Sequence, residues 1–474
     1  MALAAASQAY DICESASPMS VTRRSFIASA AATAALKSAP ARTPNIVLIF
    51  CDDLGYGDLG CYGGSLETPN IDRIAREGLR FTNCLSANPV CSPSRAALLT
   101  GRYPTRVGVP RVLFPRDEKG MPLEEVTLAD LLKERGYKTA CVGKWHLGHK
   151  PAYLPTRRGF DSYFGIPYSN DMSPAVVMDN ENVAEAEATQ ETLTARYTER
   201  AVRFIDENAR HPFFLYYPQT FPHIPLFASE RFRGKSRHGI YGDVMAEVDW
   251  SVGEILAALK RHRLERDTLV LFSSDNGPWH QGSPGPWRGR KGMTWEGGVR
   301  VPFLARQPGV IQPGVSGALI SLMDVTPTVA ARCGAALKHP VDGVDIGALL
   351  AGTAKEAARD VLLYFDDWNL QCVRKGPWKL HLARYNNVTY SPAPPGGRAN
   401  LILARPELYH LDRDPAESYD VAAENPDIVK ELRARAEQLL KDFPEPVRTA
   451  YEETLKRPAT EPAAGALPQL RATP

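Results

Sequence analysis

Two pairs of polar side chains stand where a metal site would need them. Asp52-Asp53 follows the apolar run NIVLIF, and Asp275-Asn276 follows TLVLFSS. In open α/β sheets, ligands bind beyond the carboxyl ends of the strands. Three carboxylates and an amide oxygen brought together there would repel one another without a cation, and they suit Ca²⁺ or Mg²⁺. No histidine or thiolate cluster accompanies the pairs, which argues against zinc, although either pair alone is more often a helix cap or turn.

A cysteine stands at the start of a short apolar helical pattern, CSPSRAALLTGR, at residues 91–102. Pro93 is tolerated in the first turn of a helix and Gly101 can end one, so we expect Cys91 just before the helix N-terminus. Free N–H groups and the helix dipole favour an anion there, and Arg95 would point at the same spot. We therefore expect Cys91 to have a lowered pKa and to be nucleophilic. The alternative is a buried structural cysteine.

The elements that must hold these residues alternate between strands and helices. Continuous apolar runs indicate strands buried on both faces at 45–50, 139–142, 213–217 and 268–273. Helical periodicity marks residues 123–136 and 241–262. This alternation predicts an α/β domain over residues 42–358, with a large mixed, mostly parallel sheet and helices on both faces.

The pattern changes in the last quarter of the chain. Short strand patterns at 362–365, 371–383 and 407–411 precede a charged helical pattern at 426–443. We expect a smaller α+β subdomain with an antiparallel sheet over residues 359–474. It would include a surface loop at 390–397 and a Pro- and Ala-rich tail from Arg457.

The first 41 residues have the composition of a targeting segment. Arg23-Arg24 precedes an alanine-rich apolar run at 28–36, and Ala39-Pro40-Ala41 offers small residues for cleavage. This pattern indicates a twin-arginine-type signal peptide and a periplasmic or secreted bacterial protein without a membrane span. An amphipathic N-terminal helix is the alternative.

Composition narrows the function further. The chain has 474 residues, 44% hydrophobic and 23% charged, and a formal net charge of +2, which favours neither nucleic acid nor an anionic membrane as a partner. The cysteines lack close Cys-x-x-Cys pairs, and the pairing of those left after loss of Cys13 stays open. We interpret Cys51, Cys61 and Cys84 as structural.

Several segments together resemble the sulfatase family, and within it the branch of arylsulfatase A and N-acetylgalactosamine-6-sulfatase. The sequence Cys91-Ser92-Pro93-Ser94-Arg95 with LTG after it looks like the C-x-P-x-R signature of that family. Five further segments match in order: CDDLGYGDLGCYG at 51–63, VGKWHLG at 142–148, DNG at 275–277, GRKGMTWEGGVRVP at 289–302 and LYHLDRDPAESYD at 408–420. The family belongs to the alkaline phosphatase superfamily.

The resemblance implies a specific chemistry. In the family, a formylglycine-generating enzyme oxidises the signature cysteine, here Cys91, to formylglycine. One hydroxyl of the hydrated aldehyde attacks sulfur, and the second then loses its proton so that sulfate is expelled. Asp52, Asp53, Asp275 and Asn276, together with the modified Cys91, would bind Ca²⁺, with Mg²⁺ as the other candidate.

The remaining roles also come from the resemblance. Arg95 would stabilise the aldehyde hydrate, and Lys144 would bind a sulfate oxygen. His146 would hydrogen-bond the nucleophile, and His223 would protonate the leaving oxygen. Lys291 would bridge sulfate and leaving group, although its basic neighbours Arg288 and Arg290 allow the match to shift.

Aromatic side chains follow the second acidic pair closely. Trp279, His280 and Trp287 lie in a Gly- and Pro-rich stretch, where loops at this end of a sheet set specificity. Their rings would stack on a sugar or aryl group, or alternatively pack a long loop.

The sequence therefore predicts a sulfuric ester hydrolase, and two alternative functions stay open. One is a phosphonate or phosphate ester hydrolase of the same superfamily, and the other is a non-catalytic protein that binds sulfated glycans. The expected substrate is a sulfated small molecule or polysaccharide fragment.

Overall fold

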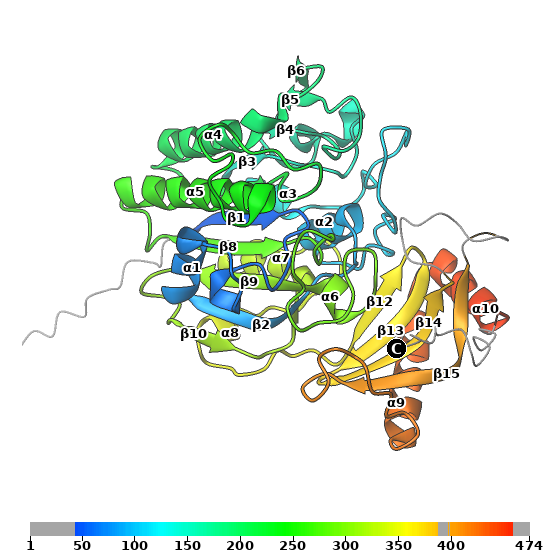
Figure 1. Cartoon of the computed structure of the whole chain (residues 1–474). Coiled ribbons are helices and arrows are strands. Elements are labelled where there is room, and N and C mark those ends of the chain that lie inside the picture. Colours follow the sequence, from blue (N-terminus) through cyan, green and yellow to red (C-terminus); the bar gives the residue numbers. More distant parts are fainter. Residues whose placement is uncertain (1–42, 387–396, 398, 458–474) are drawn as a thin grey trace, which may run out of the picture. The chain divides into compact units, whose positions relative to one another are not determined.

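The computed structural model of the chain describes residues 43–386, 397 and 399–457 (Figure 1). The predicted signal peptide at 1–41, most of the predicted loop at 390–397 and the tail after Arg457 lie outside the described residues.

A large mixed sheet forms the centre of the described chain, and six of its strand pairings are parallel against four antiparallel. The strand order is β10-β2-β9-β8-β1-β7-β3-β4-β5-β6, with β11 paired to β2. The strands are β1 (Asn45–Cys51), β2 (Leu79–Leu85), β3 (Lys138–Val142), β4 (Ser162–Gly165), β5 (Val177–Asp179), β6 (Asn182–Glu185), β7 (Phe213–Pro218), β8 (Thr268–Ser274), β9 (Arg300–Arg306), β10 (Gly314–Ser316) and β11 (Ile320–Ser321). The predicted sheet type and its four buried strands are confirmed.

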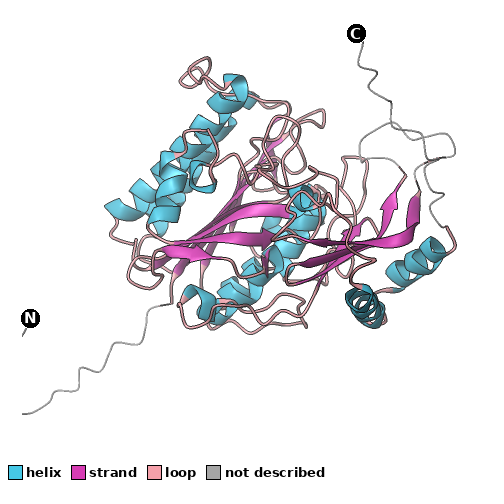
Figure 2. Cartoon of the chain, turned by 60° about the horizontal axis from the view of Figure 1, so that its bottom comes forward, coloured by secondary structure: helices cyan, strands magenta, loops and turns pink. Residues whose placement is uncertain are grey.

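Helices cover both faces of this sheet, as predicted (Figure 2). One face packs against α2 (Cys91–Thr100), α3 (Leu128–Glu134), α7 (Val325–Arg332) and α8 (Gly347–Leu350). The other packs against α1 (Pro69–Arg76), α4 (Leu193–Asn208) and α5 (Gly239–Arg261). Alternate residues of β1 serve the two cores, since Leu48 faces the first and Ile49 the second.

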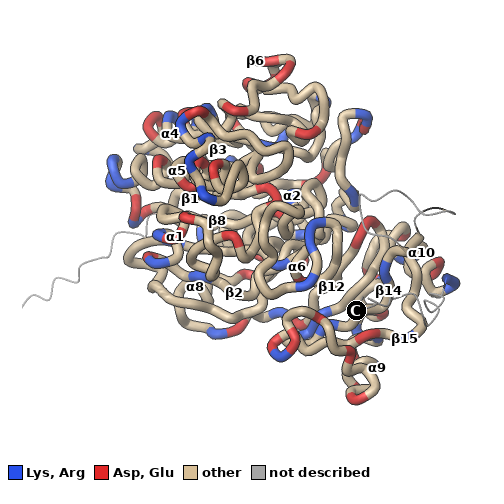
Figure 3. Tube along the Cα trace, viewed as in Figure 1, with Lys and Arg blue, Asp and Glu red and all other residues tan. Residues whose placement is uncertain are grey.

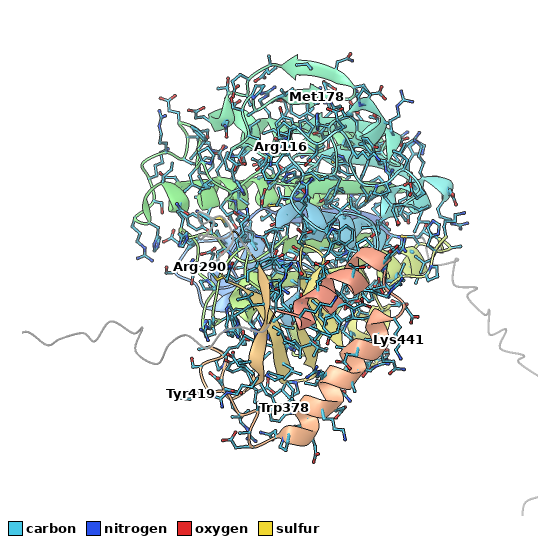
Figure 4. The ribbon with its side chains drawn as sticks, turned by 90° about the vertical axis from the view of Figure 1, so that its right-hand side faces the viewer. Arg116, Met178, Arg290, Trp378, Tyr419 and Lys441 are labelled. Carbon is cyan, nitrogen blue, oxygen red and sulfur yellow. The ribbon has the colours of Figure 1, made fainter. Side chains whose placement is uncertain are left out.

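A second, four-stranded sheet follows in the chain, and all its pairings are antiparallel. Its strands are β12 (Leu362–Asp366), β13 (Asn369–Lys375), β14 (Trp378–Tyr385) and β15 (Asn400–His410). Helices α9 (Pro426–Leu440) and α10 (Glu445–Leu455) pack against this small sheet (Figure 4). The predicted segment 371–383 is two strands because Gly376, at φ +53°, turns the chain between them. The residue boundaries of the two predicted domains stay a prediction.

Helix α3 is shorter than predicted. The sequence pattern placed its start at residue 123, but the helix begins at Leu128. Thr127 accepts a hydrogen bond from the backbone N–H of Asp130, and the Asp130 carboxylate accepts one from Thr127 N, so a capping box fixes the start. The apolar residues before Thr127 extended the periodicity without extending the helix.

Two further properties concern the described part of the chain as a whole. All seven cysteines within it are unpaired. Among the described helices, none combines the length and the apolar character that crossing a bilayer requires.

Candidate active site

The two polar pairs meet at one edge of the large sheet. Strands β1 and β8 are parallel neighbours, and their register pairs Cys51 with Ser274, so both chains leave the sheet side by side. Asp53 N donates to Asp275 Oδ1 at 3.1 Å, and Asn276 Nδ2 donates to Asp53 Oδ1 at 2.8 Å. Asp52, Asp53, Asp275 and Asn276 are all buried. The sequence expectation that these four side chains converge is confirmed.

Cys91 lies directly against this cluster. It is the first residue of α2, and its Sγ lies 3.5 Å from Asp52 Oδ1. The helix thus begins at Cys91 and not after it. The predicted lowering of its pKa is wrong, because burial and the neighbouring Asp52 carboxylate raise the pKa of the thiol far above its usual value. As an unmodified thiol, Cys91 is a poor nucleophile in this site.

Two buried cations neutralise the carboxylates. The Arg95 guanidinium donates through Nε and Nη2 to Asp275 Oδ2, at 3.1 and 2.8 Å, and lies 3.4 Å from Asp52 Oδ2. Lys144 Nζ forms an ion pair with Asp52 and donates to Ser169 Oγ at 2.9 Å. Burial alone would raise the pKa of Asp52, but Lys144, His223 and Arg95 hold it well below its usual value. Arg95 points back at the Cys91 region as predicted.

His146 lies beside the same pair of cations with one ring nitrogen held. Its Nε2 lies 2.9 Å from the carbonyl oxygen of Leu113, so Nε2 carries the proton and donates it. Buried Nδ1 has no hydrogen-bond partner among the described residues. Burial, followed by the charges of Lys144 and Arg95, lowers the pKa of His146 well below its usual value. The result is a neutral imidazole with a free lone pair at Nδ1.

His223 and Lys291 complete the group from the other side. Lys291 Nζ lies 2.9 Å from both carboxylate oxygens of Asp53, so Lys291 reaches the acidic cluster, while its role in the reaction stays a prediction. His223 Nε2 lies 3.6 Å from Asp53 Oδ2, while its Nδ1 faces Asn170 Oδ1 at 3.1 Å. Burial and the nearby Lys291 lower the pKa of His223.

The donor set fits a hard divalent cation. Asp52, Asp53, Cys91 and His223 offer potential ligand atoms that all lie within 4.8 Å of one another. The buried amide oxygen of Asn276 has no hydrogen-bond partner within the described part of the chain. Burial and the Asp52 charge raise the pKa of Asp275 to about 7. A bound cation would offset both the burial of this carboxylate and its repulsion by Asp52. No histidine cluster stands beside the acidic pairs in the sequence, but the loop after β7 brings the single His223 to them, where the resemblance placed it.

Five of the residues described above, Asp53, Cys91, His146, His223 and Lys291, form the polar floor of a cavity of about 220 Å³. Its wall is largely apolar, and the cavity is lined by Asp53, Cys91, Val112, Phe114, His146, Ser169, Asp171, Met172, His223, Ile224, Trp279 and Lys291. A polar floor under an apolar wall is typical of a site for a small ligand with one charged end.

The sequence reasoning missed the polar run Ser169-Asn170-Asp171. Ser169 accepts from Lys144, Asn170 orients His223, and Asp171 lies at the cavity wall. The run follows β4 without periodicity, so its only signal is three consecutive polar residues in a loop between apolar segments.

The structure separates the aromatic residues of the loop after β8. Trp279 lines the cavity, and the His280 ring contacts the Trp279 ring edge-on, with the two ring centroids 4.9 Å apart. Trp287 packs elsewhere, under the Arg300 guanidinium at 3.7 Å and against Tyr56. Stacking of the Trp279 ring on a substrate therefore stays a prediction, whereas Trp287 packs against neighbouring side chains of the protein.

Comparisons with known proteins agree with this geometry. The family model described as Sulfatase matches residues 44–335, and the model for the C-terminal region of aryl-sulfatase matches residues 357–470. Arylsulfatase A of Homo sapiens is 41% identical over 450 residues, covering 85% of this chain and 88% of the relative. N-acetylgalactosamine-6-sulfatase of Homo sapiens is 39% identical over 430 residues, covering 80% and 81%.

A solved structure shows the same architecture. It comes from Bacteroides thetaiotaomicron and was described in connection with the metabolism of multiple glycosaminoglycans. It superposes with a TM-score of 0.75 at 30% sequence identity, covering 84% of this chain and 99% of the other.

Proposed function

Since the chain belongs to the sulfatase family, whose members are sulfuric ester hydrolases, we propose that it removes sulfate from a carbohydrate by means of a formylglycine made from Cys91. A divalent cation, Ca²⁺ or else Mg²⁺, would assist. The division into a catalytic domain at 42–358 and a C-terminal subdomain at 359–474 is part of this proposal.

One observation carries the proposal: the signature cysteine, whose oxidation to an aldehyde the family resemblance implies, lies against the acidic cluster. Cys91 Sγ is 3.5 Å from Asp52 Oδ1, at the floor of the cavity. A raised thiol pKa argues against direct thiolate chemistry at this position. A hydrated aldehyde there would supply the attacking hydroxyl and a second hydroxyl whose deprotonation releases sulfate.

The cation would be held by Asp52, Asp53, Asp275 and Asn276, the last through its unpartnered amide oxygen. When bound, it would polarise the sulfuryl group and favour the alkoxide form of the nucleophile. Arg95 keeps the carboxylates of this set oriented, because its guanidinium engages Asp275 with two nitrogens.

Lys144 and Lys291 are the sulfate-binding residues of this proposal. Both ammonium groups are buried and are bound to Asp52 and Asp53 respectively, and of the two lysines Lys291 lines the cavity. A sulfate oxygen entering between them would meet two preorganised donors in a water-poor site, where such interactions are strong.

The two histidines divide the proton transfers. The free Nδ1 of neutral His146 would accept the hydroxyl proton of the nucleophile, because its Nε2 is already committed to Leu113. His223 Nδ1 faces the acceptor oxygens of Asn170 and Ile224, so the neutral ring carries its proton there. To act as the general acid, Nε2 would first take up a second proton, which the Asp53 carboxylate at 3.6 Å favours, and would then donate it to the leaving oxygen.

A carbohydrate is the proposed leaving group. Trp279 offers an aromatic face at the wall, and the Asp171 carboxylate offers an acceptor for hydroxyl groups. The N-acetylgalactosamine-6-sulfatase relative acts, by its name, on a sulfated sugar.

Maturation and export are also proposed from the sequence. A formylglycine-generating enzyme would read the signature around Cys91 as its substrate. The segment with Arg23-Arg24 would direct the protein to the periplasm or the exterior of a bacterial cell.

Paired aryl esters test the reaction. We expect a higher kcat/KM for p-nitrophenyl sulfate than for p-nitrophenyl phosphate or phenylphosphonate, and no turnover above background in Cys91→Ala. A preference for phosphate or phosphonate would favour the superfamily alternative. Binding of sulfated sugars without any turnover would favour the non-catalytic one.

A further inference from the structure

The segment that carries Lys291 into the site has little regular structure of its own. It runs from Arg288 to α6 (Glu296–Val299), and on the side of the active site Lys291 N donates to Pro278 O at 3.0 Å. Gly292 N donates to Pro89 O at 2.9 Å. The position of the Lys291 ammonium therefore depends on what fixes the rest of the segment.

The small sheet supplies that support. Lys379 Nζ, on β14, donates to the backbone carbonyl of Thr294 at 2.7 Å. Thr294 Oγ1 donates to Gln371 Oε1, on β13, at 2.8 Å. The backbone N–H of Glu296 donates to Glu417 Oε1 at 2.7 Å. Two residues of the stretch that follows Lys291, Thr294 and Glu296, are thus tied to residues from the last quarter of the sequence.

A buried charge cluster holds the same junction. Glu296 Oε2 lies 2.8 Å from Arg374 Nη1 and 2.8 Å from Arg300 Nη2, and Glu296 Oε1 lies 3.3 Å from Lys379 Nζ. The side chains of Glu296 and Lys379 are 0% exposed. A buried ion pair with several hydrogen bonds fixes geometry more than it adds stability, since removing one partner leaves the other charge unpaired.

An aromatic contact closes the arrangement. The Trp295 ring lies tilted on His381, with centroids 4.3 Å apart, and the Arg288 guanidinium covers Trp295 at 3.8 Å. His381 Nε2 in turn lies 2.7 Å from Glu417 Oε2. The two ends of the segment, Arg288 and the residues from Thr294 to Glu296, are therefore held by β13, β14 and the loop that carries Glu417.

We propose that Lys379 is a positioning residue for Lys291: it clamps the Thr294 carbonyl and so holds the Lys291 ammonium against Asp53. This inference rests on the proposed function, in which Lys291 binds the substrate sulfate. Lys379 acts through the two residues between Lys291 and Thr294 and does not line the cavity. The small sheet thereby takes part in the reaction without touching the substrate.

A double-mutant cycle tests the inference, with kcat/KM for p-nitrophenyl sulfate as the readout. We expect Lys379→Met to lower kcat/KM by about 10- to 100-fold in the wild-type background, because displacing a binding group by a fraction of an ångström has an effect of that order. In a Lys291→Ala background, the same change should lower kcat/KM by less than about 3-fold, because nothing remains to be positioned.

The matched control is Lys375→Met. Lys375 lies on the neighbouring strand β13 of the same sheet, but its Nζ forms an exposed ion pair with Glu431 at 2.5 Å. This variant should keep the wild-type kcat/KM. A loss equal to that of Lys379→Met would overturn the inference, because it would show a general effect of the sheet.

A second variant covers the case in which Lys379→Met does not fold. Thr294→Val removes the hydroxyl that donates to Gln371 and accepts from the Cys372 thiol, and it leaves every charge in place. We expect the same dependence on Lys291 with a smaller loss. If a folded variant loses the same factor in kcat/KM in the wild-type and Lys291→Ala backgrounds, the positioning inference is overturned and the proposed function is not. If Lys291→Ala by itself leaves kcat/KM unchanged, the proposed role of Lys291 in binding sulfate is overturned as well.

Discussion

At the scale of single residues, burial decides which groups can do which chemistry. Cys91 sits at a helix N-terminus, yet its thiol pKa rises because desolvation and Asp52 outweigh the dipole. His146 is neutral for the same reason, with one nitrogen committed and one free. The sequence places these residues in the site but carries no measure of how deeply they are buried.

The role of His223 predicts a dependence on the leaving group. His223→Ala should lower kcat by about 100-fold or more for a sugar sulfate, whose alkoxide must be protonated, and by less than about 10-fold for p-nitrophenyl sulfate. His149→Ala is the control, because His149 contacts the Tyr168 ring and does not line the cavity. Equal losses on both substrates in His223→Ala would contradict a general-acid role.

The two tryptophans should behave differently. Trp279→Ala is expected to raise KM for a sulfated sugar by about 10-fold while leaving Tm close to that of the wild type, because Trp279 lines the cavity. Trp287→Ala should lower the unfolding free energy by about 2 kcal/mol through the lost contacts with Arg300 and Tyr56. Steady-state kinetics and urea unfolding of both variants make the comparison, and reversed effects would show that the assignments are exchanged.

At the scale of elements, the strands that build the site were predictable because each is an apolar run, and in β1 and β8 the run ends in acids. Strand β9 was not, because Pro302 interrupts its run and it pairs antiparallel with both β2 and β8. The contacts of Lys291 with Asp53, and of Asn170 with His223, come from loops whose paths no periodicity records. Family resemblance found Lys291, and nothing in the sequence pattern marked Asn170.

One contact between elements predicts a pH effect on stability. The Asp249 carboxylate, on α5, accepts from the backbone N–H groups of Asn70 and Ile71 at the start of α1. Burial raises its pKa from 3.8 to about 6. The folded state then binds the proton more tightly than the unfolded state, so this group makes the unfolding free energy fall as pH rises from about 4 to about 6, by about 3 kcal/mol at most.

Asp249→Asn isolates this effect, because the amide cannot ionise. Urea unfolding at pH 4.5 and at pH 7 gives the unfolding free energy of both proteins. The unfolding free energy of the wild type minus that of the variant should be larger at pH 4.5 than at pH 7. A difference that stays constant, or that grows with pH, would contradict the raised pKa.

At the scale of the whole molecule, specificity for an anion is local. Lysine and arginine are interspersed with aspartate and glutamate along the trace (Figure 3), and the formal net charge of the chain is +2. In the proposed function, attraction of a sulfate ester would depend on the local charges of Lys144, beside Asp52, and Lys291, at the cavity, and not on a field over the surface. The interface with the small sheet, which fixes Lys291, involves contacts between distant parts of the sequence and was not predictable from it.

The proposed cation should stabilise the whole fold. A chelator is expected to lower Tm and abolish activity, and excess Ca²⁺ should restore both, since a ligand at about 100 times its Kd stabilises by about 2.7 kcal/mol. In Asn276→Ala, the change in Tm on chelation should be much smaller. A wild-type Tm that does not respond to chelator would contradict a cation at this site.

Peptide mass spectrometry of active enzyme tests the central claim most directly. Trypsin releases residues 81–95, FTNCLSANPVCSPSR, which contain Cys84 as an internal control beside Cys91. We expect a loss of about 18 Da at position 91, the exchange of a thiol for an aldehyde, with Cys84 still open to alkylation. The converted fraction should rise in proportion to kcat across preparations. A fully active preparation in which both thiols of this peptide are intact would contradict the account.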